Sequence, residues 1–162
     1  MVASGTTDTV FSLRPRTLDE YIGQEPVKKT VKFIIEASIV KETVLPHMLM
    51  QGPAGHGKTS LVNVLAKTRG VELTTLLAPS ISTTEELTTA IVAGSAGRIV
   101  FIDEIHRLRP KQQEAIYSAM EDFKIETVVG SGRYAYKQET RLLPFSLMGA
   151  TTNPGMLSKP LL

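Results

Sequence analysis

Short apolar runs alternate along this chain with longer stretches in which apolar residues recur every three or four positions. Runs of the first kind are typical of buried strands, and stretches of the second kind are typical of helices with one buried face. In chain order they predict elements at 25–39 (helix), 47–51 (strand), 58–68 (helix), 71–77 (strand), 84–92 (helix), 98–102 (strand), 111–120 (helix) and 145–150 (strand). This alternation predicts an α/β fold with a parallel sheet and helices on both faces, in which ligands bind beyond the carboxyl ends of the strands.

A different pattern fills the interval between the last predicted helix and the last predicted strand. Residues 124–141 alternate between the two faces of an extended chain on either side of the Gly-Ser-Gly segment 130–132. This pattern predicts an inserted β-hairpin. Tyr134 and Tyr136 would share one face of its second strand, because side chains two positions apart point the same way. The other face would carry the basic side chains of Arg133, Lys137 and Arg141.

Three interpretations of the tyrosine pair remain open. Exposed tyrosines often anchor protein–protein interfaces, so the pair could dock a partner protein. Because basic residues lie beside them, the rings could instead stack on nucleobases. They could also pack against Ile125, Thr127 and Val129 on the first strand of the hairpin and have no further role.

The composition narrows the class of protein. The chain has 162 residues, 42% of them hydrophobic, so we expect one domain over 13–162 after a flexible polar tail at 1–12. The absence of cysteine excludes disulfides, thiolate nucleophiles and zinc sites with sulfur ligands. Because neither a signal peptide nor a membrane-length apolar run is present, we expect a soluble, cytoplasmic protein. A net charge of +2 is too small to indicate nucleic-acid binding by itself.

The segment QGPAGHGKTS at 51–60 has the spacing of a phosphate-binding loop, and it lies between a predicted strand and a predicted helix. Its backbone conformation would depend on three glycines, Gly52, Gly55 and Gly57. They let successive N–H groups point at phosphate oxygens, with the positive end of the next helix behind them. Its polar side chains are those of Lys58, Thr59 and Ser60. The lysine would contact the β- and γ-phosphates, the threonine would bind Mg²⁺, and the serine would lie near the α-phosphate, so ATP with Mg²⁺ is the expected ligand.

The segment FIDEIHRL at 101–108 places two carboxylates and a histidine at the carboxyl end of an apolar strand, where the phosphate loop also lies. There, Asp103 can hold a water of the Mg²⁺ shell, and Glu104 can orient or deprotonate the attacking water. A zinc site is not favoured, because Asp103, Glu104 and His106 are too closely spaced to converge on one metal. We expect His106 to support the site or to begin a helix.

Five segments together give the chain a family resemblance. They are LRPRTLDEYIGQ (13–24), GPAGHGKT (52–59), FIDEIHRL (101–108), AMEDF (119–123) and GATT (149–152). In this order and spacing they resemble the AAA+ ATPases, a class of P-loop NTPases, and within it the RuvB family of bacterial Holliday junction branch-migration motors. The position of the hairpin insertion matches that family as well. The resemblance covers nearly the whole chain from residue 13.

The resemblance implies further residues of the nucleotide site. Leu13 and Arg14, with Tyr21 and Ile22, would border the adenine pocket. Thr152 would act in catalysis as a sensor that hydrogen-bonds the γ-phosphate or the attacking water. A further segment would lie near the nucleotide at the edge where subunits meet, namely Glu121, Asp122 and Phe123.

The resemblance also implies partners and an activity. The family forms homo-oligomeric rings, and a hexamer would be expected. The hairpin, 124–142 with Tyr134 and Tyr136, would engage a RuvA-like junction-binding protein. The ring would act on a DNA four-way junction and couple ATP hydrolysis to branch migration in recombination and repair.

Two departures from the family pattern bear on this activity. Asn153 occupies a position where the family commonly has arginine, which removes the basis for predicting a phosphate or subunit contact there. Residues 13–162 also lack the family's arginine finger, helical lid and winged-helix DNA-binding domain, so we expect weak ATP hydrolysis by the chain alone. Two alternatives stay open, a ring-interacting regulator without its own ATPase activity and a clamp-loader-like AAA+ ATPase.

Overall fold

The helices and strands that the sequence pattern predicts are all present, and their ends differ from the predicted ends by only one or two residues. The structure is a computed structural model that describes residues 15, 17–130 and 132–162. The predicted tail, together with Leu13 and Arg14, lies outside these residues. The main elements are α2 (Glu25–Val40), β1 (Met48–Gln51), α3 (Lys58–Arg69), β2 (Leu73–Leu77), α4 (Thr84–Gly94), β3 (Ile99–Asp103), α5 (Pro110–Glu121), β4 (Lys124–Val129), β5 (Tyr136–Arg141) and β6 (Ser146–Thr151). None of the helices in the described part of the chain is long and apolar enough to cross a membrane.

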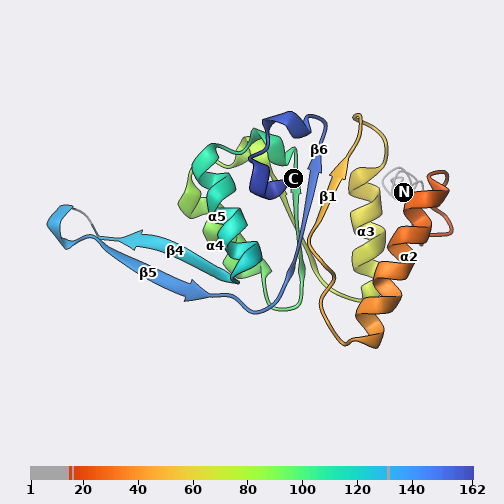
Figure 1. Cartoon of the computed structure of the whole chain (residues 1–162), viewed down its shortest axis with the longest axis horizontal. Helices are drawn as coiled ribbons and strands as arrows, with labels where there is room; N and C mark the ends of the chain where they lie inside the picture. Colours follow the sequence, from red (N-terminus) through yellow and green to blue (C-terminus); the bar gives the residue numbers. More distant parts are fainter. Residues whose placement is uncertain (1–14, 16, 131) are drawn as a thin grey trace, which may run out of the picture.

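The central sheet is parallel and has the strand order β1-β6-β3-β2. β3 and β6 occupy its middle, where Ile99 pairs with Ser146 and Ile102 pairs with Gly149. Because all four strands run the same way, their carboxyl ends meet at one edge of the sheet (Figure 1). The predicted site segments that follow β1, β3 and β6 are therefore brought to the same edge.

Two hydrophobic cores cover the two faces of the sheet. α2 and α3 pack on one face, and α4 and α5 pack on the other (Figure 1). β3 supplies both cores, since Val100 and Ile102 join the α4/α5 core while Ile99 and Phe101 join the α2/α3 core. Burial of each such side chain contributes about 1.5–3 kcal/mol. An unbroken apolar run is therefore the pattern that a central parallel strand requires.

The inserted hairpin extends away from the α/β body (Figure 1). Its strands β4 and β5 pair in antiparallel fashion from Lys124 opposite Arg141 to Val129 opposite Tyr136. The prediction that both tyrosines lie on one strand is wrong, because Tyr134 lies in a short 3-10 helix, η3 (Gly132–Tyr134), ahead of β5. The tip uses three residues in this turn, and the strand register begins only at Tyr136.

Both hairpin tyrosines are exposed to solvent, with exposed fractions of 79% for Tyr134 and 59% for Tyr136. The interpretation that they pack back against the first strand of the hairpin is therefore not supported. Three of the basic side chains are paired within the hairpin itself. Lys137 contacts Glu126 at 2.9 Å, and Lys124 and Arg141 contact Glu139 at 3.5 and 3.9 Å.

The base of the hairpin is anchored at the amino ends of the strands. The His47 ring accepts a hydrogen bond at Nδ1 from the Leu147 N–H (2.8 Å), and its Nε2 lies 3.2 Å from the Met120 carbonyl oxygen. The His47, Phe123 and Phe145 rings lie 5.6 to 6.0 Å apart. Burial lowers the pKa of His47, although the contact with the Met120 carbonyl opposes the shift. The neutral imidazole thus joins the end of α5 to the start of β6.

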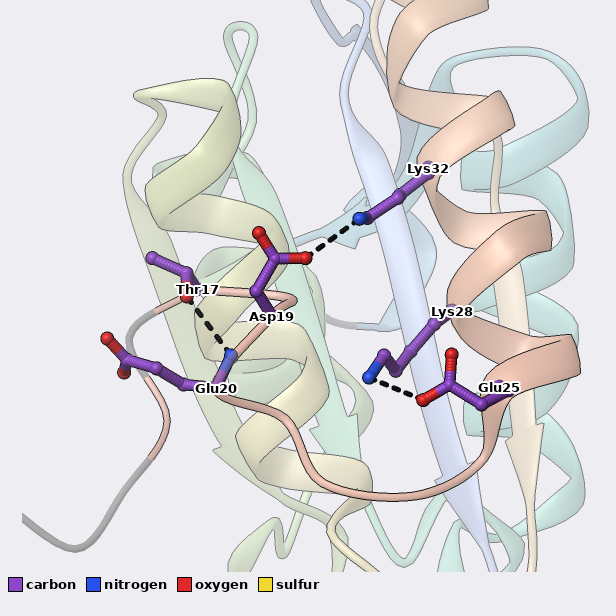
Figure 2. A network of polar contacts seen from close by, with 6 residues as sticks. All are labelled: Thr17, Asp19, Glu20, Glu25, Lys28 and Lys32. Carbon is purple, nitrogen blue, oxygen red and sulfur yellow. Dashed lines mark hydrogen bonds and ion pairs between the residues drawn. The ribbon is translucent and has the colours of Figure 1, made fainter.

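The segment before α2 is held against that helix by polar contacts. Figure 2 shows the Asp19 carboxylate directed at the Lys32 ammonium group of α2, at 2.8 Å, and the Thr17 hydroxyl accepting the Glu20 N–H. These groups are exposed, so each contact is worth little alone. Their effect is to fix the direction of the chain between two buried side chains, those of Leu18 and Tyr21.

Tyr21 packs against the loop that precedes α3. Its hydroxyl donates to the His56 carbonyl at 3.2 Å. Gly57, the next residue, has φ +79, a left-handed conformation that a residue with a side chain adopts only with strain. A Cβ atom at Gly57 would lie 2.7 Å from the Tyr21 hydroxyl oxygen. The glycine is thus required both by the backbone turn and by the close approach of the ring.

We expect Gly57→Ala to destabilise the protein more than Gly55→Ala. Both positions have a positive φ, so both substitutions carry a backbone cost of about 1 kcal/mol. At Gly57 the added methyl group would also clash with Tyr21, and such overpacking typically lowers the free energy of unfolding by about 1–3 kcal/mol. At Gly55 nothing lies within 4 Å of a Cβ atom, so no such cost is expected. Urea unfolding measures the difference. Tyr21→Phe should recover part of the loss in the Gly57 variant, and equal losses at the two glycines would contradict the contact.

Candidate nucleotide-binding site

The loop between β1 and α3, residues 52–57, turns sharply at the carboxyl edge of the sheet. Gly55 and Gly57 both have positive φ, and the Leu61 N–H donates to the Gly57 carbonyl, which begins α3 directly after the loop. The amino end of α3 therefore faces the same edge. Its unpaired N–H groups and helix dipole favour an anion at this position.

The ammonium group of Lys58 lies across this loop. Its Nζ donates to the carbonyl oxygens of Gly52 and Pro53, at 2.8 Å in each case. Both acceptors belong to the loop itself, so the lysine closes the turn and holds its positive charge beside the loop. An ammonium group held in this way is a phosphate-binding group without competing ion pairs among the described residues.

Thr59 and Asp103, predicted as the Mg²⁺ residues, lie side by side although they are far apart in the sequence. The Thr59 hydroxyl donates to Asp103 Oδ2 at 3.3 Å. Asp103 Oδ1 accepts the backbone N–H of Glu104 at 3.0 Å, which fixes the orientation of the carboxylate. A hydroxyl and a carboxylate oxygen are hard ligands of the kind that Mg²⁺ prefers. The donor set therefore fits this ion.

Glu104 leaves the strand in the left-handed conformation, with φ 52. The 3-10 turn η2 (Ile105–Arg107) begins directly after it. The carboxylate is half-exposed and lies 4.0 Å from Nε of Arg107, a weak surface contact. Glu104 thus keeps an accessible carboxylate at the mouth of the site.

A cavity of about 360 Å³ joins these groups. Cavities of this order accommodate small-molecule ligands. Its walls come from the phosphate loop and from the ends of β2, β3 and β6. The lining residues are Ala54, Gly55, Gly57, Lys58, Thr59, Ser60, Leu77, Asp103, Glu104, Ala150, Thr151 and Thr152. Apart from Gly52, the residues predicted to bind phosphate, to bind Mg²⁺ and to act in hydrolysis therefore face one space.

Several residues implied by the resemblance lie outside this cavity. Tyr21 lies beneath Gly57 and not on the cavity wall, and Ile22 is 95% exposed. Phe123 packs on Phe145 and His47 at the amino ends of the strands, the edge opposite the phosphate loop. Glu121 and Asp122, which precede it, end α5 on that side. Within this chain, 121–123 do not border the nucleotide cavity, so only their proximity to a neighbouring subunit's nucleotide stays a prediction.

Sequence reasoning missed Thr151, a polar residue buried at the end of β6. Its Oγ1 lies 3.0 Å from Nδ1 of His106 and accepts the Asn153 N–H at 3.0 Å. Two consecutive threonines at the end of a strand were the sequence signal that could have indicated this residue, but a role was predicted for Thr152 alone. His106 has the supporting position that was expected. Within the described ranges, no group of three His, Cys, Asp or Glu residues is placed so that it could hold a metal ion.

Comparisons with known proteins agree with this geometry. Residues 13–162 match the family model of the Holliday junction DNA helicase RuvB P-loop domain. The chain is 46% identical over 151 residues to the Holliday junction branch migration complex subunit RuvB of Helicobacter hepaticus, with 93% of this chain and 45% of that protein covered. The chain thus spans about half the length of the curated relative that it matches.

Solved structures give the same result. A mutant RuvB of Thermotoga maritima superposes with a TM-score of 0.81 at 37% identity, covering 93% of this chain and 46% of that chain. The Thermotoga maritima RuvB Holliday junction branch migration motor has a TM-score of 0.78 at 38% identity, with 92% and 45% covered. These matches support the AAA+ fold and favour RuvB over the clamp-loader-like alternative. The chain belongs to the RuvB P-loop domain family.

Proposed function

We propose that this chain is the ATP-binding and ATP-hydrolysing domain of a Holliday junction branch-migration motor. The observation that carries the proposal is the convergence of Lys58, Thr59, Asp103, Glu104 and Thr152 on one cavity at the carboxyl edge of the sheet. Family membership supports the same function. Phosphoryl transfer depends mainly on positioning and charge neutralisation, and this set of groups can supply both.

Binding begins with the phosphate loop. Its glycines leave the backbone N–H groups free to contact phosphate oxygens, and the amino end of α3 adds positive potential. Lys58 exchanges its contacts with the Gly52 and Pro53 carbonyls for contacts with the β- and γ-phosphates. Ser60 lies on the cavity wall one residue further along α3 and would face the α-phosphate side.

Thr59 and Asp103 would hold Mg²⁺, the threonine directly and the aspartate through a water of the ion's shell. When bound, the ion neutralises charge on the phosphate oxygens. The 3.3 Å hydrogen bond between the two side chains keeps both oxygens at one place before any ion arrives. Because the two side chains are already ordered, binding of Mg²⁺ would cost less conformational entropy.

Hydrolysis is assigned to Glu104 and Thr152. The half-exposed carboxylate of Glu104 would orient the attacking water and accept its proton. Thr152, at the end of β6, would hydrogen-bond the γ-phosphate or that water. An arginine from a neighbouring subunit completes such sites and can raise the rate by about 10³–10⁵. We therefore propose that the chain hydrolyses ATP weakly alone and faster in a homo-oligomeric ring, a hexamer by family resemblance, on a DNA four-way junction.

The hairpin is proposed to dock a RuvA-like junction-binding protein. Two exposed tyrosines at its tip, Tyr134 and Tyr136, provide the aromatic anchors that interfaces use. Direct stacking on DNA bases is less well supported, because Lys124, Lys137 and Arg141 are already paired with carboxylates of the hairpin.

Lys58→Ala should weaken Mg·ATP binding by about 10- to 100-fold, because a charge-assisted hydrogen bond contributes about 1.5–3 kcal/mol. Lys67→Ala is the matched control, since Lys67 lies on the same helix and is exposed at its far end. Fluorescence titration with a labelled ATP measures both. Unchanged affinity in the Lys58 variant would show that the loop does not bind phosphate.

Glu104→Gln should leave ATP affinity within about twofold and lower the hydrolysis rate by about 10²–10⁴-fold, the usual contribution of a general base. Glu114→Gln, at an exposed position of α5, serves as the control. Phosphate release should be measured alone and together with a RuvB relative that supplies an arginine and whose own site is inactive. A Glu104 variant as fast as the parent would exclude this residue as the water-orienting group.

Replacing both hairpin tyrosines, Tyr134→Ala with Tyr136→Ala, should weaken binding to a RuvA-like protein by at least about tenfold, as for aromatic hot spots. ATP affinity should not change, because the hairpin is distant from the cavity. Gln138→Ala, also exposed on β5, is the control. Surface plasmon resonance measures the partner affinity. If the double variant binds as the parent does, another surface engages the partner.

A further inference from the structure

A buried side-chain pair connects the two strand ends that carry the proposed hydrolytic groups. His106 is 8% exposed and Thr151 is fully buried, and their Nδ1 and Oγ1 atoms lie 3.0 Å apart. The same hydroxyl oxygen accepts the Asn153 N–H at 3.0 Å. A hydroxyl group has one proton and two lone pairs, so it can serve both partners at once.

The backbone pairing of β3 with β6 stops just before the site. Its last paired residues are Ile102 and Gly149. Beyond that point, Glu104 follows β3 by one residue and Thr152 follows β6 by one residue. The β3–β6 register has no pair at these two positions. Backbone pairing holds the end of β3 only to β2, as far as Asp103, and the end of β6 only to β1, as far as Thr151. A direct connection between the two ends therefore has to come from side chains.

Two side chains of the 3-10 turn η2 (Ile105–Arg107) contact β6 and so connect the two strand ends. Ile105 packs over β6 so closely that a Cβ at Gly149 would lie 2.9 Å from its Cδ1 atom. His106 then reaches Thr151 two residues further along β6. The turn begins directly after Glu104, and Thr151 directly precedes Thr152. The pair thus spans the gap that the backbone pairing leaves.

We propose that His106 and Thr151 are positioning residues that fix the separation between the Glu104 carboxylate and the Thr152 hydroxyl. The inference rests on the proposed function, because Thr152 is assigned there to the γ-phosphate. Loss of the hydrogen bond leaves the loop, Lys58 and Mg²⁺ residues in place and moves Thr152 relative to Glu104. Binding of a triphosphate should suffer, while binding of a diphosphate should not.

Thr151→Val tests the pair, because valine has the shape of threonine without its hydroxyl. With Mg²⁺ present, its affinity for a non-hydrolysable ATP analogue should fall by about three- to tenfold, and its ADP affinity should change by less than about twofold. Thr151→Ser keeps the hydroxyl and should restore the parent ratio of the two affinities. Ser146→Ala is the matched control, since Ser146 is also buried on β6 and donates to the Leu45 carbonyl at the opposite end.

The combined His106→Ala and Thr151→Val variant should lower the analogue affinity no further than the more damaging single change, because each single change already removes the hydrogen bond that the two side chains share. A Thr151→Val protein with the parent's ratio of affinities overturns the inference, as does an equal loss for ADP or an equal effect of Ser146→Ala. If the parent binds neither nucleotide, the proposed function itself fails. If the parent binds ADP, a failed Thr151→Val prediction counts against the positioning role alone and not against nucleotide binding.

Discussion

The parallel pairing of β3 with β6 between two hydrophobic cores is the constraint on which the rest of the structure depends. β3 has apolar side chains on both faces, so its position in the middle of the sheet is fixed by burial from both sides. Parallel pairing then brings the carboxyl ends of β1, β3 and β6 to one edge. The phosphate loop, the carboxylates and the threonine pair converge because of this geometry.

The phosphate loop depends on packing from a segment distant in the sequence. Tyr21 lies against Gly57 and hydrogen-bonds the loop backbone at His56, and the chain that carries it is held to α2 by the Asp19–Lys32 contact. Glycines permit the left-handed turns of the loop, yet they also leave it with more freedom before folding. Contact with the buried Tyr21 ring restricts that freedom in the folded protein.

The base of the hairpin lies toward the amino ends of the central strands, whereas the nucleotide cavity lies at their carboxyl ends. Figure 1 shows α5 running along the sheet between these two ends. At one end of α5, the Gln113 side chain contacts the Leu108 carbonyl and accepts the Ser158 N–H, close to the segments that follow β3 and β6. At the other end, His47 joins the Met120 carbonyl to β6. A single helix therefore connects the base of the hairpin with the turns that carry the candidate site.

The sequence by itself determined the α/β class and the element boundaries to within two residues, because apolar periodicity is a local property. Loop spacing and strand ends also selected Lys58, Thr59, Asp103 and Glu104 as candidates that line one cavity, while Thr152 came only from the family resemblance. Only the tertiary structure decided that Tyr134 lies in a turn, that Phe123 lies at the edge opposite the phosphate loop, and that His106 meets Thr151. His106 and Thr151 are 45 positions apart, and their contact depends on strand order and register, which burial of the whole sheet fixes and no local pattern encodes.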